Sequence, residues 1–166
     1  IAFAERAEAP INSAQTKIIG PSYQDSLRSL AAKLWMIEHA EHTLDLTYYI
    51  FTYDPAGNAI LGALCNAVKR GVDIRLMVDS LGSVNLSHSP LRALETCALD
   101  AGPIRDVHGL KPPDKARVQA VIINALTSIS SWSNRRSHDK LIIKDGSFPG
   151  KDMVMTGGRN ISVDYY

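Results

Sequence analysis

Apolar residues recur at two different periods along the chain, and the two periods predict helices and strands in alternation. Between residues 22 and 41, leucines and an isoleucine recur every three or four positions, which predicts an amphipathic helix. Ser22 is the expected N-cap of this helix, and Asp25 occupies the capping-box position. The β-branched and aromatic residues over 43–51 predict a strand that "DPAGN" interrupts.

Further elements follow from the same patterns. We expect a second amphipathic helix over 59–71, a buried strand over 72–80, a third helix over 89–102 and a short strand within 103–109. The stretch 111–136 is the least regular, and we interpret it as one helix over 114–127 followed by a Ser-rich loop. A strand at residues 138–144 and a partner at 153–158 predict a hairpin with a long loop. Residues 1–21 predict an extended arm.

This order of elements predicts an α/β fold, in which helices pack on a layered sheet. The 166 residues are 45% apolar and 21% charged, which suits one globular domain with its own core. No apolar run approaches the roughly 18–20 residues that a membrane span needs. The chain begins with Ile1 rather than Met, so we expect a processed or excised product. Removal of a signal peptide is one way in which such a product could arise.

The two cysteines, Cys65 and Cys97, lie in segments that we expect to be helical. They have no C-x-x-C spacing, so they do not predict a metal site. Free buried thiols are the interpretation that we favour, and a disulfide is the alternative.

Basic residues gather locally although the net charge is only +1. The near-neutral total counts against a general nucleic-acid binder. The local cluster can be a solvated strand edge or part of an anion site, and its members are Arg135, Arg136, His138, Lys140 and Lys144.

The stretch "SHDKLIIKDG" places His138 and Lys140 two positions apart, so that on a strand both side chains leave the same face. After the predicted hairpin, "GGRN" brings Gly157 and Gly158, whose backbone N–H groups can approach an anion closely, and Asn160, which adds a side-chain donor. If the two strands pair, these groups converge on a volume suited to a tetrahedral phosphate.

His-x-Lys-x4-Asp followed by Gly-Gly-x-Asn resembles the signature of the phospholipase D superfamily. The stretches "YYIFTYDPAGNAILGALCNAVKRGVDIRLMVDSLGS" and "GGRNISVDYY" are similar to its cardiolipin-synthase-like branch, and the resemblance covers roughly residues 23–110 and 134–166. It implies a mixed β-sheet flanked by helices on both faces, and a phospholipase D-like half-domain over 22–166. Two departures from the family pattern are a long loop before Gly157 and residues 111–136, which we interpret as an insert.

The resemblance also implies roles for matching residues. His138 would attack phosphorus to give a covalent phosphohistidine, or would protonate the leaving group. Lys140 and Asn160, with Gly157 and Gly158, would hold the phosphate oxygens, so no metal or other cofactor is expected. Asp145 completes the motif, and we interpret it as a structural carboxylate.

Two further positions are candidates for the site. Tyr49 is a candidate for the pocket because relatives carry a similar pair of tyrosines. Asp79 and Ser80 end a predicted strand where α/β sheets bind ligands, although turn formation before Gly82 is the interpretation that we favour.

In this family, two such motifs face each other across a pseudo-twofold axis, and this chain carries one. We expect the second on a C-terminal continuation, with a homodimer as the alternative. The expected function is phospholipid hydrolysis or phosphatidyl transfer at a membrane surface. The sequence does not assign a compartment, and the periplasm and the cell exterior are both open. A metal-independent nuclease and a catalytically silent anion-binding half-domain are the alternatives, and nucleic acid is not the expected substrate.

Overall fold

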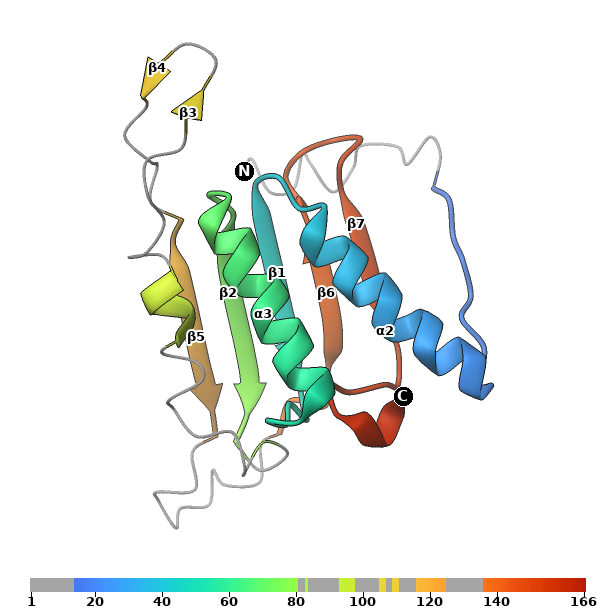
Figure 1. Cartoon of the computed structure of the whole chain (residues 1–166). Coiled ribbons are helices and arrows are strands. Elements are labelled where there is room, and N and C mark those ends of the chain that lie inside the picture. The colour runs from blue at the N-terminus through green and yellow to red at the C-terminus, as the bar shows by residue number, and fades with distance from the viewer. Residues whose placement is uncertain are drawn as a thin grey trace, which may run out of the picture.

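A five-stranded mixed sheet forms the centre of the molecule (Figure 1). The structure is a computed structural model that describes residues 14–80, 83, 93–97, 105–106, 109–110, 116–124 and 136–166. The strand order is β5-β2-β1-β6-β7. The strands are β1 (Thr43–Tyr48), β2 (Asp73–Asp79), β5 (Val118–Ile123), β6 (Lys140–Lys144) and β7 (Met153–Thr156).

Strands of both directions meet at β1. Strands β5, β2 and β1 are parallel, whereas β6 is antiparallel to β1 and β7 is antiparallel to β6. The mixed sheet and the β6–β7 hairpin are therefore confirmed. A separate two-stranded ribbon joins β3 (Arg105–Asp106) to β4 (Gly109–Leu110), within or next to the short strand expected at 103–109.

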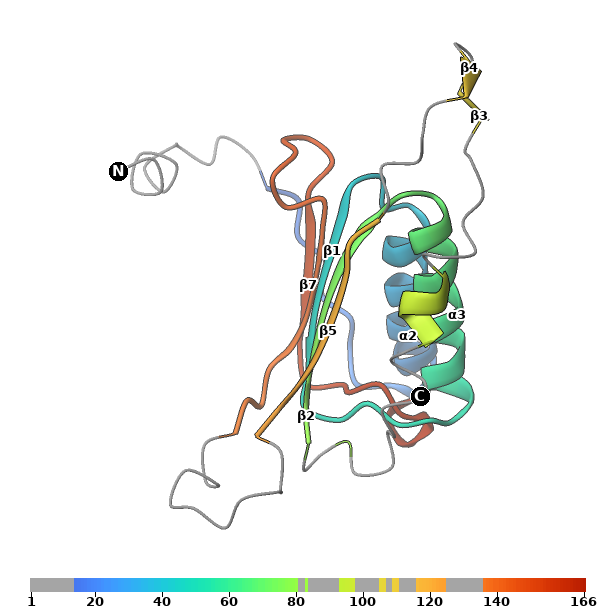
Figure 2. The same cartoon turned by 90° about the vertical axis from the view of Figure 1, so that its left-hand side faces the viewer.

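Two helices, α2 (Tyr23–Glu38) and α3 (Pro55–Lys69), lie side by side on the same face of the sheet (Figure 2). The α/β class is confirmed. The helical layer expected on the other face is not found within the described parts of the chain, where that face carries partly exposed strand residues. A short 3-10 helix, η2 (Val163–Tyr165), follows the last strand.

Both helix starts are set by side chains. The Ser22 hydroxyl accepts the backbone N–H of Asp25 at 3.1 Å, as the capping pattern predicts. Helix α3 begins four residues earlier than predicted, because Asp54 caps it and Pro55 occupies the first helical position. The "DPAGN" stretch, predicted to interrupt the strand, also starts this helix. Gly57 is required there, since a Cβ would lie 1.8 Å from the carbonyl oxygen of Thr52.

The helix predicted over 114–127 is wrong, because residues 118–123 form β5 at the edge of the sheet. Val118, Ala120 and Ile122 pack against the core. A short apolar run of this kind fits a strand as well as a helix. This part of 111–136 belongs to the sheet. The helix expected over 89–102 is described only at 93–97, which is helical.

The core fills the layer between the helices and the sheet. Burying each large apolar side chain contributes roughly 1.5–3 kcal/mol. The largest fully buried ones are Met36, Ile37, Leu44, Leu46, Tyr48, Phe51, Ile60, Leu64, Ile74, Leu76, Leu94 and Ile142. In the part of the chain that is described, no helix combines the length and apolar character that crossing a bilayer requires.

Cys65 and Cys97 form a disulfide, with their Cα atoms 5.5 Å apart, so the favoured interpretation as free thiols is wrong. The partners are 32 positions apart in sequence, and only the folded chain brings them together. The bond ties the helical segment 93–97 to α3.

Candidate functional site

His138 and Lys140 lie side by side at the end of the sheet where β1 finishes. Lys140 begins β6 and pairs with Tyr48, the last residue of β1. Its ammonium donates to the backbone oxygen of His138 at 2.7 Å and lies 3.2 Å from the Nδ1 atom of the same residue. The His138 side chain is exposed, whereas Lys140 is only 6% exposed. Desolvation lowers the pKa of Lys140, and the charge of Asp139 partly opposes this.

Tyr49 contacts both members of this pair. Its ring centroid lies 4.9 Å from that of His138, and the Lys140 ammonium is 5.5 Å from the Tyr49 ring. The backbone N–H of Tyr49 donates to the carbonyl oxygen of Asp139 at 3.1 Å, which holds the two segments together. A cation over an aromatic face is favourable. Tyr49 therefore lies beside His138 and Lys140, whereas Tyr48 is the tyrosine that lines the cavity next to Lys140.

The "GGRN" segment returns to the same end of the sheet. Leu141 pairs with Thr156, so Gly157 and Gly158 follow β7 beside the start of β6, and both glycines line a cavity together with Lys140. A Cβ added at either glycine would meet nothing within 4 Å. The space beside this backbone is therefore open to a ligand.

Asn160 is held against the segment that follows β1. Its side-chain oxygen accepts the backbone N–H of Ile50 at 3.0 Å, and the residue is 1% exposed. Ile161 continues this contact by donating to the carbonyl oxygen of Ile50 at 3.1 Å. No described residue accepts a hydrogen bond from Nδ2 of Asn160, so this amide group can donate to a ligand.

The His138–Lys140 pair, Tyr49, the two glycines and Asn160 thus lie around the carboxyl end of β1. Tyr49 and Ile50 follow this strand directly, and they contact His138 and Asn160, respectively. Ligands of α/β sheets commonly bind outside the carboxyl ends of strands. The arrangement offers an imidazole, an ammonium and an amide to a small anion.

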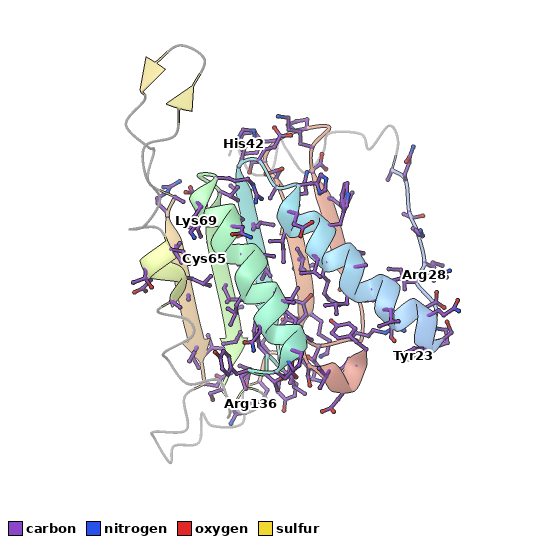
Figure 3. All side chains as sticks on the ribbon, viewed as in Figure 1. Tyr23, Arg28, His42, Cys65, Lys69 and Arg136 are labelled. Carbon is purple, nitrogen blue, oxygen red and sulfur yellow. A yellow bond between two sulfur atoms is a disulfide. The ribbon has the colours of Figure 1, made fainter. Side chains whose placement is uncertain are left out.

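Asp145 lies at the opposite end of β6, about 16 Å of extended strand away from Lys140. Its carboxylate is fully buried and accepts backbone N–H groups of Glu41, His42 and Thr43 at 2.7–3.1 Å. Figure 3 shows His42 and Arg136 at opposite ends of the sheet. The structure does not bring Asp145 together with His138.

The pKa of Asp145 is lowered to about 2. Burial acts to raise it, but the three backbone donors and the Lys144 ammonium, 3.1 Å away, stabilise the ionised form more strongly. Its contacts fit the structural interpretation, since the carboxylate holds the turn between α2 and β1.

A buried carboxylate at the end of β2 fixes the chain just before His138. Asp79 is 1% exposed, lies 3.3 Å from the guanidinium of Arg136 and accepts the side-chain amide of Asn124 at 2.8 Å. The backbone N–H of Ser137 also points to it at 3.4 Å. Sequence reasoning placed Asp79 at a ligand-binding edge but missed this partnership, because 57 positions separate Asp79 from Arg136.

Lys33 is a second residue that sequence reasoning missed. It lies on the buried face of α2, is 2% exposed and donates to the Ser29 hydroxyl at 3.1 Å. The ammonium lies 5.1 Å from the ring centroid of Tyr166. The sequence did contain a signal for its burial, because Lys33 shares the helical spacing of the buried residues Ser26, Ser29, Met36 and Ile37.

No three His, Cys, Asp or Glu side chains within the described ranges gather closely enough to hold a metal ion.

A mixed sheet with a His-x-Lys pair at the end of a central strand is the arrangement expected of a phospholipase D-like domain. Residues 34–165, most of the chain, match the family model described as cardiolipin synthase, PLD-like domain. The chain belongs to this family.

Curated relatives agree with this assignment. Cardiolipin synthase C of Escherichia coli (strain K12) is 34% identical over 145 residues, which are 86% of this chain and 27% of that protein. Cardiolipin synthase of Geobacillus kaustophilus is 26% identical over 156 residues, which are 94% of this chain and 26% of that protein. The chain spans about a quarter of the length of these relatives.

A solved structure is also similar to this chain. It is Nuc, a phospholipase D family member from Salmonella typhimurium, with a TM-score of 0.47 and 24% sequence identity. The match covers 81% of this chain and 66% of that chain.

Proposed function

We propose that this chain supplies one half of the active site of a phosphodiester hydrolase or transferase that acts on phospholipids. The observation that carries the proposal is the contact between the Lys140 ammonium and the His138 ring, beside the open backbone of Gly157 and Gly158. Membership of the cardiolipin synthase PLD-like domain family supports the lipid substrate.

In the proposed reaction, Lys140 and Asn160 hold the non-bridging oxygens of the scissile phosphate and stabilise the charge that develops on them. A histidine nitrogen attacks phosphorus and forms an N–P bond while the P–O bond to the leaving alcohol breaks. A second histidine donates a proton to the leaving oxygen. Water or an alcohol then attacks phosphorus, returns a proton to the second histidine and breaks the N–P bond.

The Lys140 contact bears on which of these two roles His138 has. An ammonium can only donate, so the Nδ1 atom of His138 accepts, and the proton of the neutral ring lies on Nε2. In this tautomer Nε2 has no lone pair for attack, and a proton donor would need a second proton on Nδ1. A nucleophilic Nε2 needs an acceptor for a proton on Nδ1, and no described residue provides one. We therefore infer that attack by His138 requires an acceptor from elsewhere in the assembled site.

The second His-x-Lys half comes from a continuation of the chain or from a second copy, and we favour the continuation. Two facing halves provide the two histidines that the two-step reaction needs, one for attack and one for proton transfer.

The test uses the full-length protein as its gene encodes it, with phospholipid vesicles and a chelator. We expect release of phosphatidic acid or transfer of the phosphatidyl group, and loss of both in His138→Asn. His39→Asn is the matched control because His39 is exposed and lies at the end of α2. Turnover of DNA without lipid turnover would favour the nuclease, and anion binding without turnover would favour the silent half-domain.

Trapping and mapping of the phosphorylated residue separates the two roles of His138. A phosphohistidine at position 138 would make it the nucleophile. A phosphohistidine only in the second half would make His138 the proton donor.

A further inference from the structure

A cavity of about 410 Å³ opens beside the candidate catalytic pair, between α2, the start of β6 and the segment after β7. Lys140 belongs to the catalytic pair and also lines this cavity. Neither His138 nor Asn160 lines it. Figure 1 shows α2 on the side of the sheet that β6 and β7 form. The cavity therefore shares Lys140, Gly157 and Gly158 with the candidate phosphate site and extends away from His138 toward Lys33 and Arg159.

The described walls of this cavity are cationic. Lys33 and Lys140 are buried, Arg159 is partly buried and Lys17 is exposed at the side of the N-terminal segment. No Asp or Glu is found among the described residues that line it. Four basic side chains, and no acidic one among the described lining residues, indicate a site for an anion.

The contacts of Lys33 and Arg159 leave their charges uncompensated. Lys33 donates to the Ser29 hydroxyl and lies over the Tyr166 ring, while Arg159 donates to the carbonyl oxygen of Gly20 at 2.5 Å. Neither forms an ion pair with a described carboxylate. Burying an unpaired ammonium is unfavourable, and such groups are normally paired in folded proteins.

Burial, together with the charge of Arg159, lowers the pKa of Lys33 to about 8. Lys33 and Arg159 repel each other inside this cavity, and a bound anion would relieve that repulsion. The side chain remains largely protonated at neutral pH and can therefore bind such a group.

We propose that this cavity binds a second anionic group of the phosphate class, held by Lys33 and Arg159 and separate from the scissile phosphate at His138. The inference deepens the proposed function and rests on it for the choice of phosphate as the anion. The volume exceeds that of one phosphate, and Ile18, Ile19 and Met155 add apolar wall for carbon atoms bonded to it. The group can belong to a lipid in the membrane or to a soluble phosphate ester.

The first test follows Lys33 directly. In full-length protein labelled with ¹³C at lysine Cε, the Lys33 resonance is assigned with Lys33→Arg and titrated with pH. Inorganic phosphate should raise its midpoint by about one unit relative to chloride at equal ionic strength, because a nearby opposite charge favours the protonated form. Phosphatidylglycerol vesicles provide the second arm.

A shift with vesicles but not with inorganic phosphate identifies a lipid-borne group, and a shift with inorganic phosphate identifies a site open to free phosphate. Either result supports the proposal. An unchanged midpoint in both arms would overturn it. The proposal also fails if the shift disappears in His138→Asn, since the anion would then lie at the catalytic pair.

Binding measurements on variants give an independent test. Affinity for the probe that shifts Lys33 should fall at least tenfold in Lys33→Gln and in Arg159→Gln. Lys69→Gln removes the same charge from the exposed end of α3 and should leave affinity within twofold. Equal affinity in all three variants would refute the site. These readouts need no turnover, so they remain valid if the proposed catalytic function fails.

Discussion

Asp79 and Arg136 form an ion pair of 3.3 Å in which the carboxylate is fully buried. Arg136 lies two residues before His138, whose side chain is exposed. The pair joins the end of β2 to the segment that enters β6. Because Asp79 also accepts from Asn124 at the end of β5, one carboxylate links three segments at the candidate site.

This relationship makes Asp79 a positioning residue. Asp79→Asn should lower kcat by roughly tenfold or more while KM changes little, since small displacements of reacting groups reduce rates strongly. It should also cost about 3–5 kcal/mol of stability, because Arg136 would lose a buried partner. Steady-state kinetics and urea denaturation of the full-length protein measure the two effects.

Asp45→Asn is the matched control for this prediction. Asp45 pairs with the exposed Arg75 on the open face of the sheet, and such pairs contribute about 0–1 kcal/mol. Equal effects of the two substitutions would show that Asp79 has no special role.

Asp145→Asn should destabilise the fold without a specific effect on catalysis. The substitution keeps the shape and suits the backbone, since Asn tolerates the positive φ of 50° at this position. It replaces a carboxylate that accepts three backbone N–H groups by an amide, and we expect a loss of about 2–4 kcal/mol. The exposed Asp152 on the same hairpin gives the control Asp152→Asn.

The loss should depend on pH with a definite sign. The pKa of Asp145 is about 2 in the folded state against an ordinary value of 3.8, so its contribution is present above about pH 4 and is lost as pH falls toward 2. Denaturation of the wild type and Asp145→Asn at pH 7 and pH 2.5 should therefore show a smaller difference at the lower pH. A constant difference would contradict the assignment.

Local patterns predicted the elements whose partners are close in sequence. The Ser22 cap, the alternation of helices and strands, and the β6–β7 hairpin follow from neighbouring residues. The same is true of the contact between His138 and Lys140, which needs only the geometry of an extended chain.

Contacts between distant segments were not accessible in this way. The disulfide between Cys65 and Cys97 and the pairing of β5 with β2 depend on tertiary placement. The run "VQAVII" is too short for its period to separate strand from helix. Asp145 could be interpreted as structural, but its hydrogen bonds to residues 41–43 required the folded chain.

Removal of the disulfide should destabilise the fold more than its local packing explains. For a closed loop of this size, with 32 positions between the cysteines, the loss of chain entropy in the unfolded state corresponds to about 3–4 kcal/mol. Cys65→Ala with Cys97→Ala should lower the midpoint of urea denaturation under oxidising conditions. Under reducing conditions the midpoint of the wild type should fall nearly to that of the variant. Equal midpoints of wild type and variant under oxidising conditions would contradict the prediction.

Lys33→Met should stabilise the protein at neutral pH, against the usual direction of a core substitution. The pKa of Lys33 is about 8 in the folded state against an ordinary value of 10.5, so between pH 8 and pH 10.5 the unfolded chain binds this proton more tightly than the folded one. The resulting penalty is fully present below pH 8 and disappears as pH rises through 10.5. The difference of the two values corresponds to a few kcal/mol, on the order of 3.

Methionine removes this penalty but also the hydrogen bond to Ser29 and the contact with Tyr166, which together offset about 1–2 kcal/mol. We expect a net gain of about 1–2 kcal/mol at pH 7 that shrinks and then reverses near pH 10. Urea denaturation of both proteins at the two pH values measures it, with Lys69→Met as the exposed control. A gain that is independent of pH would mean that Lys33 is not a buried ammonium with a lowered pKa. Saturating phosphate should abolish the gain, because a bound anion would stabilise the wild type alone.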